Sequence, residues 1–309
     1  MSEVEKFKKL GAELSNWGRW GLDDRLGTLN LITESHVRDA ARLVRTGRIF
    51  DLGLPIGAGS PPQRAESPRF DPVHLMLRSP DEVWPGGMIG ADDMIVLPLQ
   101  AVTQWDGLGH NGYDGQFYNG VPASSVTSKG STIHSVHEIA AKGVVGRGVL
   151  LDVAHLADGP LGQGDRISPE DLDAACAAQG VTVGAGDILL IRTGWIERWT
   201  RDHDVRELWD GQPGLSLDCA RWLHDRDVAA VLMDNTGVEH IPTDPGHGTS
   251  WPLHCVLIRD MGMTLGEMAV LDQLADDCHR DGVWEFLFVA TPLKVERSVG
   301  SPITPIAVK

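Results

Sequence analysis

Four side chains that can bind a metal ion or move a proton lie within eleven residues of LPLQAVTQWDGLGHNGYDGQFYNG. They are Gln100, Gln104, Asp106 and His110. The same stretch contains GLGHNG, a literal match to the G-x-G-x-x-G pattern of dinucleotide-binding loops. Two kinds of chemistry are therefore open, a phosphate-binding loop or part of a metal-dependent site.

The residues after GLGHNG do not favour the phosphate-binding loop. A dinucleotide loop must open a helix whose N-terminal amides hold the pyrophosphate. Gly112 is instead followed by YDGQFYNGVP, whose glycines, tyrosines and proline do not favour a helix. No acidic residue closes a second strand where the ribose hydroxyl would require one. We expect the glycines to let the backbone turn sharply beside a site.

The even spacing of the four polar residues favours a strand with all four on one face. On such a strand the Cα atoms of Gln104 and Asp106 would lie roughly 7 Å apart, so their side chains can share one ion. A straight run from Gln100 to His110 would span about 33 Å, which is too long. The glycines must therefore fold His110 back, and a bulge must bring in Gln100, the weakest candidate for a direct ligand.

Two glutamines and one carboxylate are weak ligands without further charge or imidazole. The best further donors are His254 and Glu267, in WPLHCVLIRDMGMTLGEMAVL. Asp234, Asn235 and Glu239 end another apolar run, where sites of α/β proteins often gather, and are candidates for supporting positions.

The composition limits the class of protein. Of 309 residues, 42% are hydrophobic and 23% are charged, as in ordinary globular proteins. The 43 acidic residues outnumber 27 Lys and Arg, and the net charge of −16 makes nucleic acid a poor partner. No apolar run approaches the roughly 18 residues of a membrane helix, and MSEVEKFKKLG is no signal peptide. The four cysteines form no C-x-x-C pair, so we expect reduced thiols in a cytoplasmic protein.

Apolar strands alternate with capped helices in the middle of the chain, which predicts an α/β domain. Strands are expected in GVLLDVA, GDILLIRTGW, VAAVLMDN and the closing WEFLFVATPL and SPITPIAV. Helices are expected from Thr33 to Gly47, from Ser168 to Gly180, and in LHCVLIRDMG and GEMAVLDQLADDC. We predict an N-terminal arm and helix over residues 1–48 and one domain over 49–309.

The polar stretch resembles a motif of the cyclase or kynurenine formamidase-like family of metal-dependent hydrolases. That motif is H-x-G-T-H-x-D-x-P-x-H, and here Gln100 and Gln104 replace both leading histidines. The variant Q-x-x-x-Q-x-D-x-x-x-H resembles the pattern of trans-dienelactone hydrolase. LHCVLIRDMGMTLGE, FLFVATPLKVERSVGSPITPIAV and NWGRWGLDDRLGTLN also resemble segments of this family.

The resemblance implies a single domain of the swivelling β/β/α type, with a mixed sheet core and flanking helices. It implies one divalent metal ion, Zn²⁺ or Mn²⁺, and a homo-oligomer, a dimer or a tetramer. Amide oxygens in place of imidazoles shift the metal preference towards Mn²⁺. The implied ligands are Gln100, Gln104, Asp106, His254 and Glu267, with His110 as the acid and base.

These roles predict hydrolysis of a small cyclic or aromatic lactone, ester or amide. The ion would acidify a water molecule and polarise the substrate carbonyl, while His110 moves the proton. Aromatic side chains could form the wall of an apolar substrate pocket; the candidates are Trp105, Tyr113, Tyr118, Trp17 and Trp20.

Two other readings of the site stay open. The same ion could serve a lyase or dehydratase acting on an enolisable substrate. The two glutamines also allow a family member that has lost its chemistry and only binds. A serine hydrolase is disfavoured because no G-x-S-x-G elbow occurs in the sequence.

Overall fold

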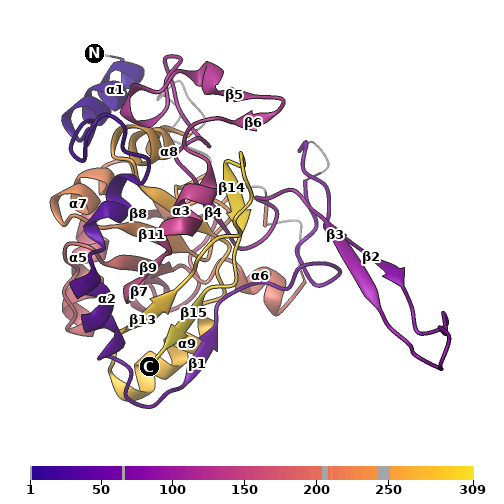
Figure 1. Cartoon of the computed structure of the whole chain (residues 1–309). Helices are drawn as coiled ribbons and strands as arrows, with labels where there is room; N and C mark the ends of the chain where they lie inside the picture. The colour runs from indigo at the N-terminus through magenta and orange to yellow at the C-terminus, as the bar shows by residue number, and fades with distance from the viewer. Residues whose placement is uncertain (1, 65–66, 204–207, 210, 242–250) are drawn as a thin grey trace.

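The computed structural model describes residues 2–64, 67–203, 208–209, 211–241 and 251–309. Nine strands in these residues form one mixed sheet at the centre of the molecule (Figure 1). In spatial order they are β1 (Ile49–Asp51), β15 (Ile306–Val308), β13 (Glu285–Val289), β7 (Val145–Asp152), β9 (Ile188–Arg192), β11 (Ala230–Met233), β12 (Thr264–Glu267), β4 (Gln104–Asp106) and β14 (Gly300–Pro302).

The middle of the sheet is parallel and its flanks are antiparallel. Strands β7, β9, β11 and β12 run parallel to one another, as expected where helices connect consecutive strands. Strands β13, β15 and β1 extend one side in antiparallel fashion, and β4 and β14 extend the other. The predicted α/β domain with a mixed sheet core is thereby confirmed.

Both faces of the parallel strands are buried, which explains why their sequences are continuous apolar runs. In β9, Leu189 and Ile191 point into one core, whereas Ile188 and Leu190 point into the other. Helices α5 (Pro169–Gln179) and α7 (Cys219–Asp225) cover the first core. Helices α3 (Val136–Lys142) and α9 (Asp272–Asp281) cover the second.

The remaining elements lie at the edges and in the connections. The α-helices among them are α1 (Glu3–Glu13), α2 (Glu34–Ala41), α4 (Val153–Leu156), α6 (Glu197–Thr200) and α8 (Pro252–His254). The short 3-10 helices are η1 (Gly27–Leu31), η2 (Tyr118–Gly120) and η3 (Ala123–Ser125), and η4 (Cys255–Asp260) is a π-helix. The two-stranded pairs are β8 (Arg166–Ile167) with β10 (Gly214–Leu215), β2 (Val73–Arg78) with β3 (Asp92–Val96), and β5 (Val126–Thr127) with β6 (Gly130–Ser131).

Local capping rules hold well for α5. Ser168 forms a capping box with Asp171, Pro169 is the first helical residue, and Gly180 ends the helix in the left-handed conformation at φ 64°. Helix α2 begins at its predicted cap, Thr33, but ends at Ala41, before the expected Gly47. The backbone N–H groups of Thr46 and Gly47 donate to the carbonyl of Lys309 instead, which ties this segment to the C-terminus.

The prediction of one helix over GEMAVLDQLADDC is wrong at its start. Gly266 and Glu267 belong to β12, which is hydrogen-bonded to β11 on one side and β4 on the other. The helix begins only at Asp272. Sheet pairing with segments distant in sequence overrides the local helical pattern here. Among the helices of the described residues, none has the length and apolar character needed to cross a bilayer.

Candidate metal centre

Strands β4 and β12 place Gln104, Asp106 and Glu267 on one face of the sheet. The register sets Glu267 opposite Gln104 and Leu265 opposite Asp106, and residues directly opposite each other point to the same side. Gln104 Nε2 donates to Glu267 Oε2 over 2.6 Å, and all three polar side chains are buried. Pairing across the sheet therefore assembles the first donors.

His254 reaches this group from the end of α8. Its Nε2 atom lies 3.1 Å from Glu267 Oε1. One ligand atom each of Asp106, His254 and Glu267 lies within 4.8 Å of the others, a spacing that can hold one metal ion. The structure thus brings together four residues that the sequence proposed as ligands: Gln104, Asp106, His254 and Glu267.

Glu239 holds the imidazole of His254 in place from the other side. Its Oε1 atom lies 2.6 Å from His254 Nδ1 and accepts the backbone N–H of His254 over 2.8 Å. Burial opposes charge on the ring, but the hydrogen bonds to Glu239 and Glu267 outweigh it and raise the pKa of His254 to about 10. A carboxylate behind a histidine is the usual arrangement that orients a metal ligand.

Two oxygen atoms of this group accept no hydrogen bond from the described residues. Asp106 Oδ1 and Gln104 Oε1 are buried and have no hydrogen-bond partner among the described residues. Burial, and then the nearby Glu267 carboxylate, raise the pKa of Asp106 well above its ordinary range. Buried unpaired acceptors and two facing carboxylates are costly without a compensating cation. The donor set of carboxylates, one amide oxygen and one imidazole therefore fits a divalent metal ion.

His110 lies beside Asp106 because the chain turns back directly after β4. The backbone N–H of His110 donates to the carbonyl of Gly107, which closes this turn. A side chain at position 107 would not fit, because an added Cβ atom would come within 2.9 Å of Val136. His110 Nε2 is 3.6 Å from Asp106 Oδ2. Burial, with the charges of His254 and Arg69, lowers the pKa of His110 to about 3. The ring is therefore neutral near pH 7 and can accept a proton.

Gln100 contacts His110 and lies outside the strand. The segment QAVTQ was expected to be extended, but residues 99–103 form turns and bends, and β4 contains only three residues. Gln100 Nε2 lies 3.4 Å from His110 Nδ1, so this glutamine borders the predicted acid and base. Pro98 interrupts the strand pairing, and the carbonyl of Pro98 accepts the N–H of Ala101 in a turn. The role of Gln100 as a metal ligand stays a prediction.

The expectation that Trp105 forms part of a substrate pocket is wrong. Its neighbours in β4 face the polar group, so the alternation of the strand points Trp105 to the opposite face. There the ring is fully buried in the second core, and Nε1 donates to the carbonyl of Ala290 over 2.5 Å. Trp105 is a core residue.

Tyr113 and Trp17 surround an arginine of the π-helix. The Arg259 guanidinium lies 3.9 Å from the ring centre of Tyr113 and 4.6 Å from that of Trp17. The Tyr113 hydroxyl donates to Asp260 over 2.9 Å, and Trp17 Nε1 donates to the carbonyl of Arg259 over 2.7 Å. These contacts join the N-terminal arm to the segment that follows His254.

Tyr118 also contacts the N-terminal arm, which contains Trp20. Tyr118 is fully buried, and its hydroxyl donates to Asp24 over 3.0 Å. Burial, together with the Asp24 carboxylate, raises the pKa of the Tyr118 hydroxyl. The Arg19 guanidinium lies 4.8 Å from the ring centre of Trp20. For Tyr113, Tyr118, Trp17 and Trp20, substrate binding stays a prediction.

Arg69 is a neighbour of the site that the sequence did not indicate. It lies in the Pro- and Gly-rich segment 57–71, where no periodicity points to a partner. Its Nη1 donates to the carbonyl of Gln100 over 2.8 Å. Its charge opposes the rise in the pKa of Asp106 and contributes to lowering the pKa of His110. Only the folded loop brings this cation to the acceptors.

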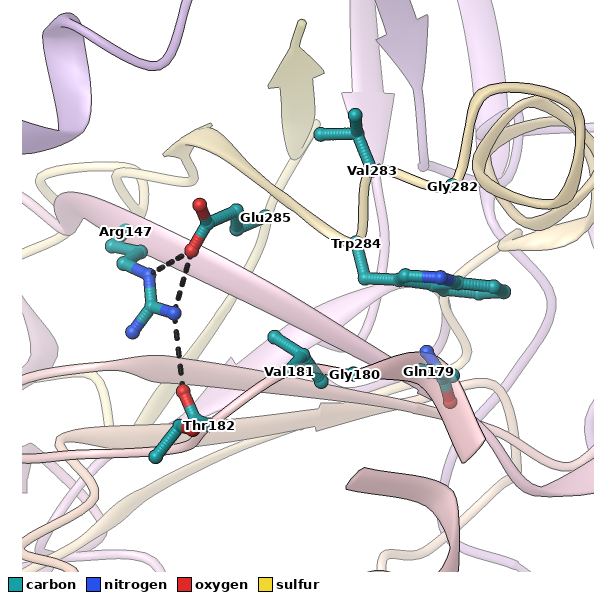
Figure 2. Close-up of a pocket in the computed structure, with 9 residues that line it drawn as sticks. All are labelled: Arg147, Gln179, Gly180, Val181, Thr182, Gly282, Val283, Trp284 and Glu285. Atoms are coloured by element: carbon teal, nitrogen blue, oxygen red, sulfur yellow. Dashed lines mark hydrogen bonds and ion pairs between the residues drawn. The ribbon is translucent and has the colours of Figure 1, made fainter. Parts of the chain in front are cut away.

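A separate cavity of about 350 Å³ lies at the opposite end of the parallel strands (Figure 2). Arg147 in its wall contacts Glu285, Asp187 and the carbonyl of Thr182. These contacts tie β7 to β13 and to the segment before β9. They account for Arg147 as a structural residue.

This architecture is shared with known proteins. A family model described as "Putative cyclase" matches residues 50–240. The chain belongs to this cyclase family. A solved structure described as a novel cyclase is 37% identical, with a TM-score of 0.89, and the match covers 97% of this chain and 99% of that one. The predicted membership of the cyclase family is therefore confirmed, and the glutamine-type variant stays a prediction.

The cyclase-family chain is also similar to isatin hydrolases. Isatin hydrolase of Roseibium aggregatum is 29% identical over 150 residues, which are 46% of this chain and 52% of that protein. The match thus spans about half the length of this curated relative. The structure of isatin hydrolase A from Ralstonia solanacearum, at 19% identity and a TM-score of 0.62, covers 84% of this chain and 91% of that one. At this identity, the likeness shows a shared fold.

Proposed function

We propose that this protein is a metal-dependent hydrolase of a small cyclic or aromatic carbonyl compound, a lactone, ester or amide. One observation carries the proposal. Two buried carboxylates, Asp106 and Glu267, face one imidazole within 4.8 Å, while Asp106 Oδ1 and Gln104 Oε1 lack partners in the described residues. A neutral histidine, His110, stands 3.6 Å from the same aspartate. Such a group needs a cation and has a proton carrier beside it.

Asp106, Glu267 and His254 would hold the cation, and the Gln104 amide oxygen would be a further ligand. A divalent ion bound there supplies a water molecule of lowered pKa and a Lewis acid for the substrate carbonyl. Glu239 keeps His254 turned towards the site, and Gln104 Nε2 restrains Glu267. With one imidazole among oxygen donors, we propose Mn²⁺ over Zn²⁺. The glutamines in place of histidines support the dienelactone hydrolase-type variant of the family.

His110 would transfer the proton from water to the leaving group during turnover. The neutral ring accepts a proton from the attacking water as the new C–O bond forms. It then donates this proton to the leaving oxygen or nitrogen as the old bond to the carbonyl carbon breaks. A carboxylic acid and an alcohol or amine result, the acid loses its proton to solvent at neutral pH, and no oxidant is required. The similarity to a relative named isatin hydrolase supports a ring-shaped substrate.

The test is hydrolysis in H₂¹⁸O by purified protein with a defined metal content. Candidate substrates are lactones, aromatic lactams such as isatin, and aryl amides, with chelated protein and protein reloaded with Mn²⁺ or Zn²⁺. We expect turnover that follows the metal content and one ¹⁸O atom in the product carboxylate. Full activity of rigorously metal-free protein would refute the proposal, and a product without label would point to lyase chemistry.

A further inference from the structure

The cavity of about 350 Å³ between the ends of helices α5 and α9 is separate from the metal centre (Figure 2). Its volume lies at the lower end of the range for small-molecule sites, which is about 300 to 1,000 Å³. Strands β7 and β13 contribute Arg147 and Glu285 to its wall. The charges and the apolar surface of this wall decide which class of ligand the cavity can take.

Arg147 cannot attract an anion into the cavity, because its donors are already used. Its Nε and Nη2 atoms contact Glu285 Oε2 over 2.8 and 2.6 Å, and Nη1 donates to Asp187 Oδ2 over 2.7 Å. Nη2 also donates to the carbonyl of Thr182 over 3.1 Å. One guanidinium thus faces two carboxylates, so one negative charge remains uncompensated among these three side chains.

Glu285 supplies an acceptor that is still open. Both of its contacts with Arg147 end on Oε2, and Oε1 has no hydrogen-bond partner among the described residues. Figure 2 shows this second oxygen directed away from Arg147. The Glu285 side chain keeps 39% of its surface exposed, so a ligand can reach it. Carboxylate oxygens accept their strongest hydrogen bonds from cationic donors.

The C-terminal ends of both helices lie at the cavity. Gly180 ends α5 and Gly282 ends α9, each in the left-handed conformation, and both glycines line the wall. A Cβ atom built on either glycine would meet no atom within 4 Å, so the space beside both helix ends is open. The last carbonyl groups of a helix carry partial negative charge, which favours a cation.

The rest of the wall is apolar. Val181, Val283 and Trp284 line the cavity beside the polar groups (Figure 2). An aromatic ring attracts an ammonium group and also packs against hydrocarbon. A ligand with a cationic nitrogen and a small apolar part therefore matches both kinds of surface.

We propose that this cavity binds a small organic cation, a primary ammonium with an apolar substituent, between the C-terminal ends of α5 and α9. The ammonium would donate to Glu285 Oε1 and to carbonyl oxygens at the helix ends, and the substituent would lie against Trp284 and Val181. The net charge of −16 attracts cations to the chain as a whole. Binding here is independent of the proposed hydrolase activity, because no residue of the metal centre lines the cavity.

Three probes of similar size and different charge test the proposal. They are benzylamine, which is a cation at neutral pH, benzyl alcohol and benzoate. Isothermal titration calorimetry with the full chain measures the affinity for each probe. We expect benzylamine to bind, and the neutral and anionic probes to bind at least about 10-fold more weakly, the factor that loss of a charge-assisted hydrogen bond produces.

Glu285→Gln tests whether the amine binds in this cavity. The variant removes the open carboxylate and should bind benzylamine about 10-fold more weakly than wild type. Glu138→Gln is the matched control, because Glu138 pairs with Arg25 on a different part of the molecule. This control and Glu267→Gln, at the metal centre, should keep the wild-type affinity.

Circular dichroism checks that each variant folds. If Glu285→Gln does not fold, Val283→Lys replaces it; this wall position is 41% exposed, and the new ammonium would compete with benzylamine. Absence of benzylamine binding to wild type, or equal affinities for the three probes, would overturn the proposal. Unchanged affinity in the cavity variant would overturn it as well, because the amine would then bind elsewhere.

Discussion

His254 is clamped between two glutamates, with Nδ1 2.6 Å from Glu239 Oε1 and Nε2 3.1 Å from Glu267 Oε1. Glu239 also accepts the backbone N–H groups of Leu253 and His254, which fixes the start of the helical segment around the ring. The imidazole therefore presents a fixed nitrogen to Asp106 and Glu267. Glu239 thus orients His254, as strands β4 and β12 orient Asp106 and Glu267.

Glu239→Gln should weaken metal binding without removing any ligand atom. Loss of such an outer carboxylate typically lowers metal affinity about 10- to 100-fold. The affinity is measured by competition with a chromogenic chelator. Asp187→Asn is the matched control, because it removes a buried carboxylate that pairs with Arg147 at the other end of the sheet. It should cost stability and leave the metal affinity unchanged; equal affinity losses in both variants would contradict the role of Glu239.

Metal removal should lower the melting temperature of the wild-type protein. A ligand that binds only the folded state stabilises it by about 2.7 kcal/mol at a free concentration of 100 times Kd. Differential scanning calorimetry with chelator and with added Mn²⁺ gives the shift. Glu267→Gln removes one of the facing carboxylates and should show little response to Mn²⁺. A response as large as that of wild type would place the ion elsewhere.

His110→Ala should retain metal and lose turnover. A positioned acid or base contributes roughly 10²- to 10⁴-fold to the rate, so kcat should fall by that order while elemental analysis shows unchanged metal content. His224→Ala is the control, since His224 lies on α7 and contacts Asp225. An unaltered kcat in His110→Ala would remove this histidine from the reaction.

Asp234 should make stability depend on pH. Burial raises its pKa from 3.8 to about 6, against the hydrogen bonds from Thr193 and Gly194. Because the folded pKa is the higher one, this group stabilises the fold fully below pH 3.8 and loses that effect as the pH rises through 6. The change is about 3 kcal/mol. Urea unfolding of wild type and Asp234→Asn should show a stability difference that shifts towards wild type on acidification; a constant difference would contradict it.

Trp105→Phe should affect stability and spare substrate affinity. The change leaves the buried carbonyl of Ala290 without its donor, which costs about 1 to 3 kcal/mol. Urea unfolding measures the loss, and KM for the best substrate should stay at the wild-type value. A raised KM with unchanged stability would return Trp105 to the substrate pocket.

Local patterns in the sequence predicted the parts of the fold that local forces determine. Ser168, Pro169 and Gly180 fixed the ends of α5, and continuous apolar runs identified the parallel strands. The alternation from Gln104 to Asp106 correctly placed both side chains on one face. Each of these features depends on neighbouring residues or on a simple period.

Pairing between distant segments accounts for what the sequence did not show. Glu267 looked helical because its partners, in β4 and β11, lie far away in the chain. The contact between Gln100 and His110 depends on the turns over residues 99–103, which the residue types there do not predict. Strands β2 and β3 pair only with each other and lie apart from the central sheet, an arrangement that no local pattern of residues predicts (Figure 1).

The register between β4 and β12 limits how this family member can change in evolution. β4 has three residues, and it pairs with β12 on one side and β14 on the other. Inserting or deleting a single residue there would turn Gln104 and Asp106 into the apolar core and Trp105 towards the acidic group. Length variation should therefore accumulate in the surrounding loops, while these strands change only by substitution.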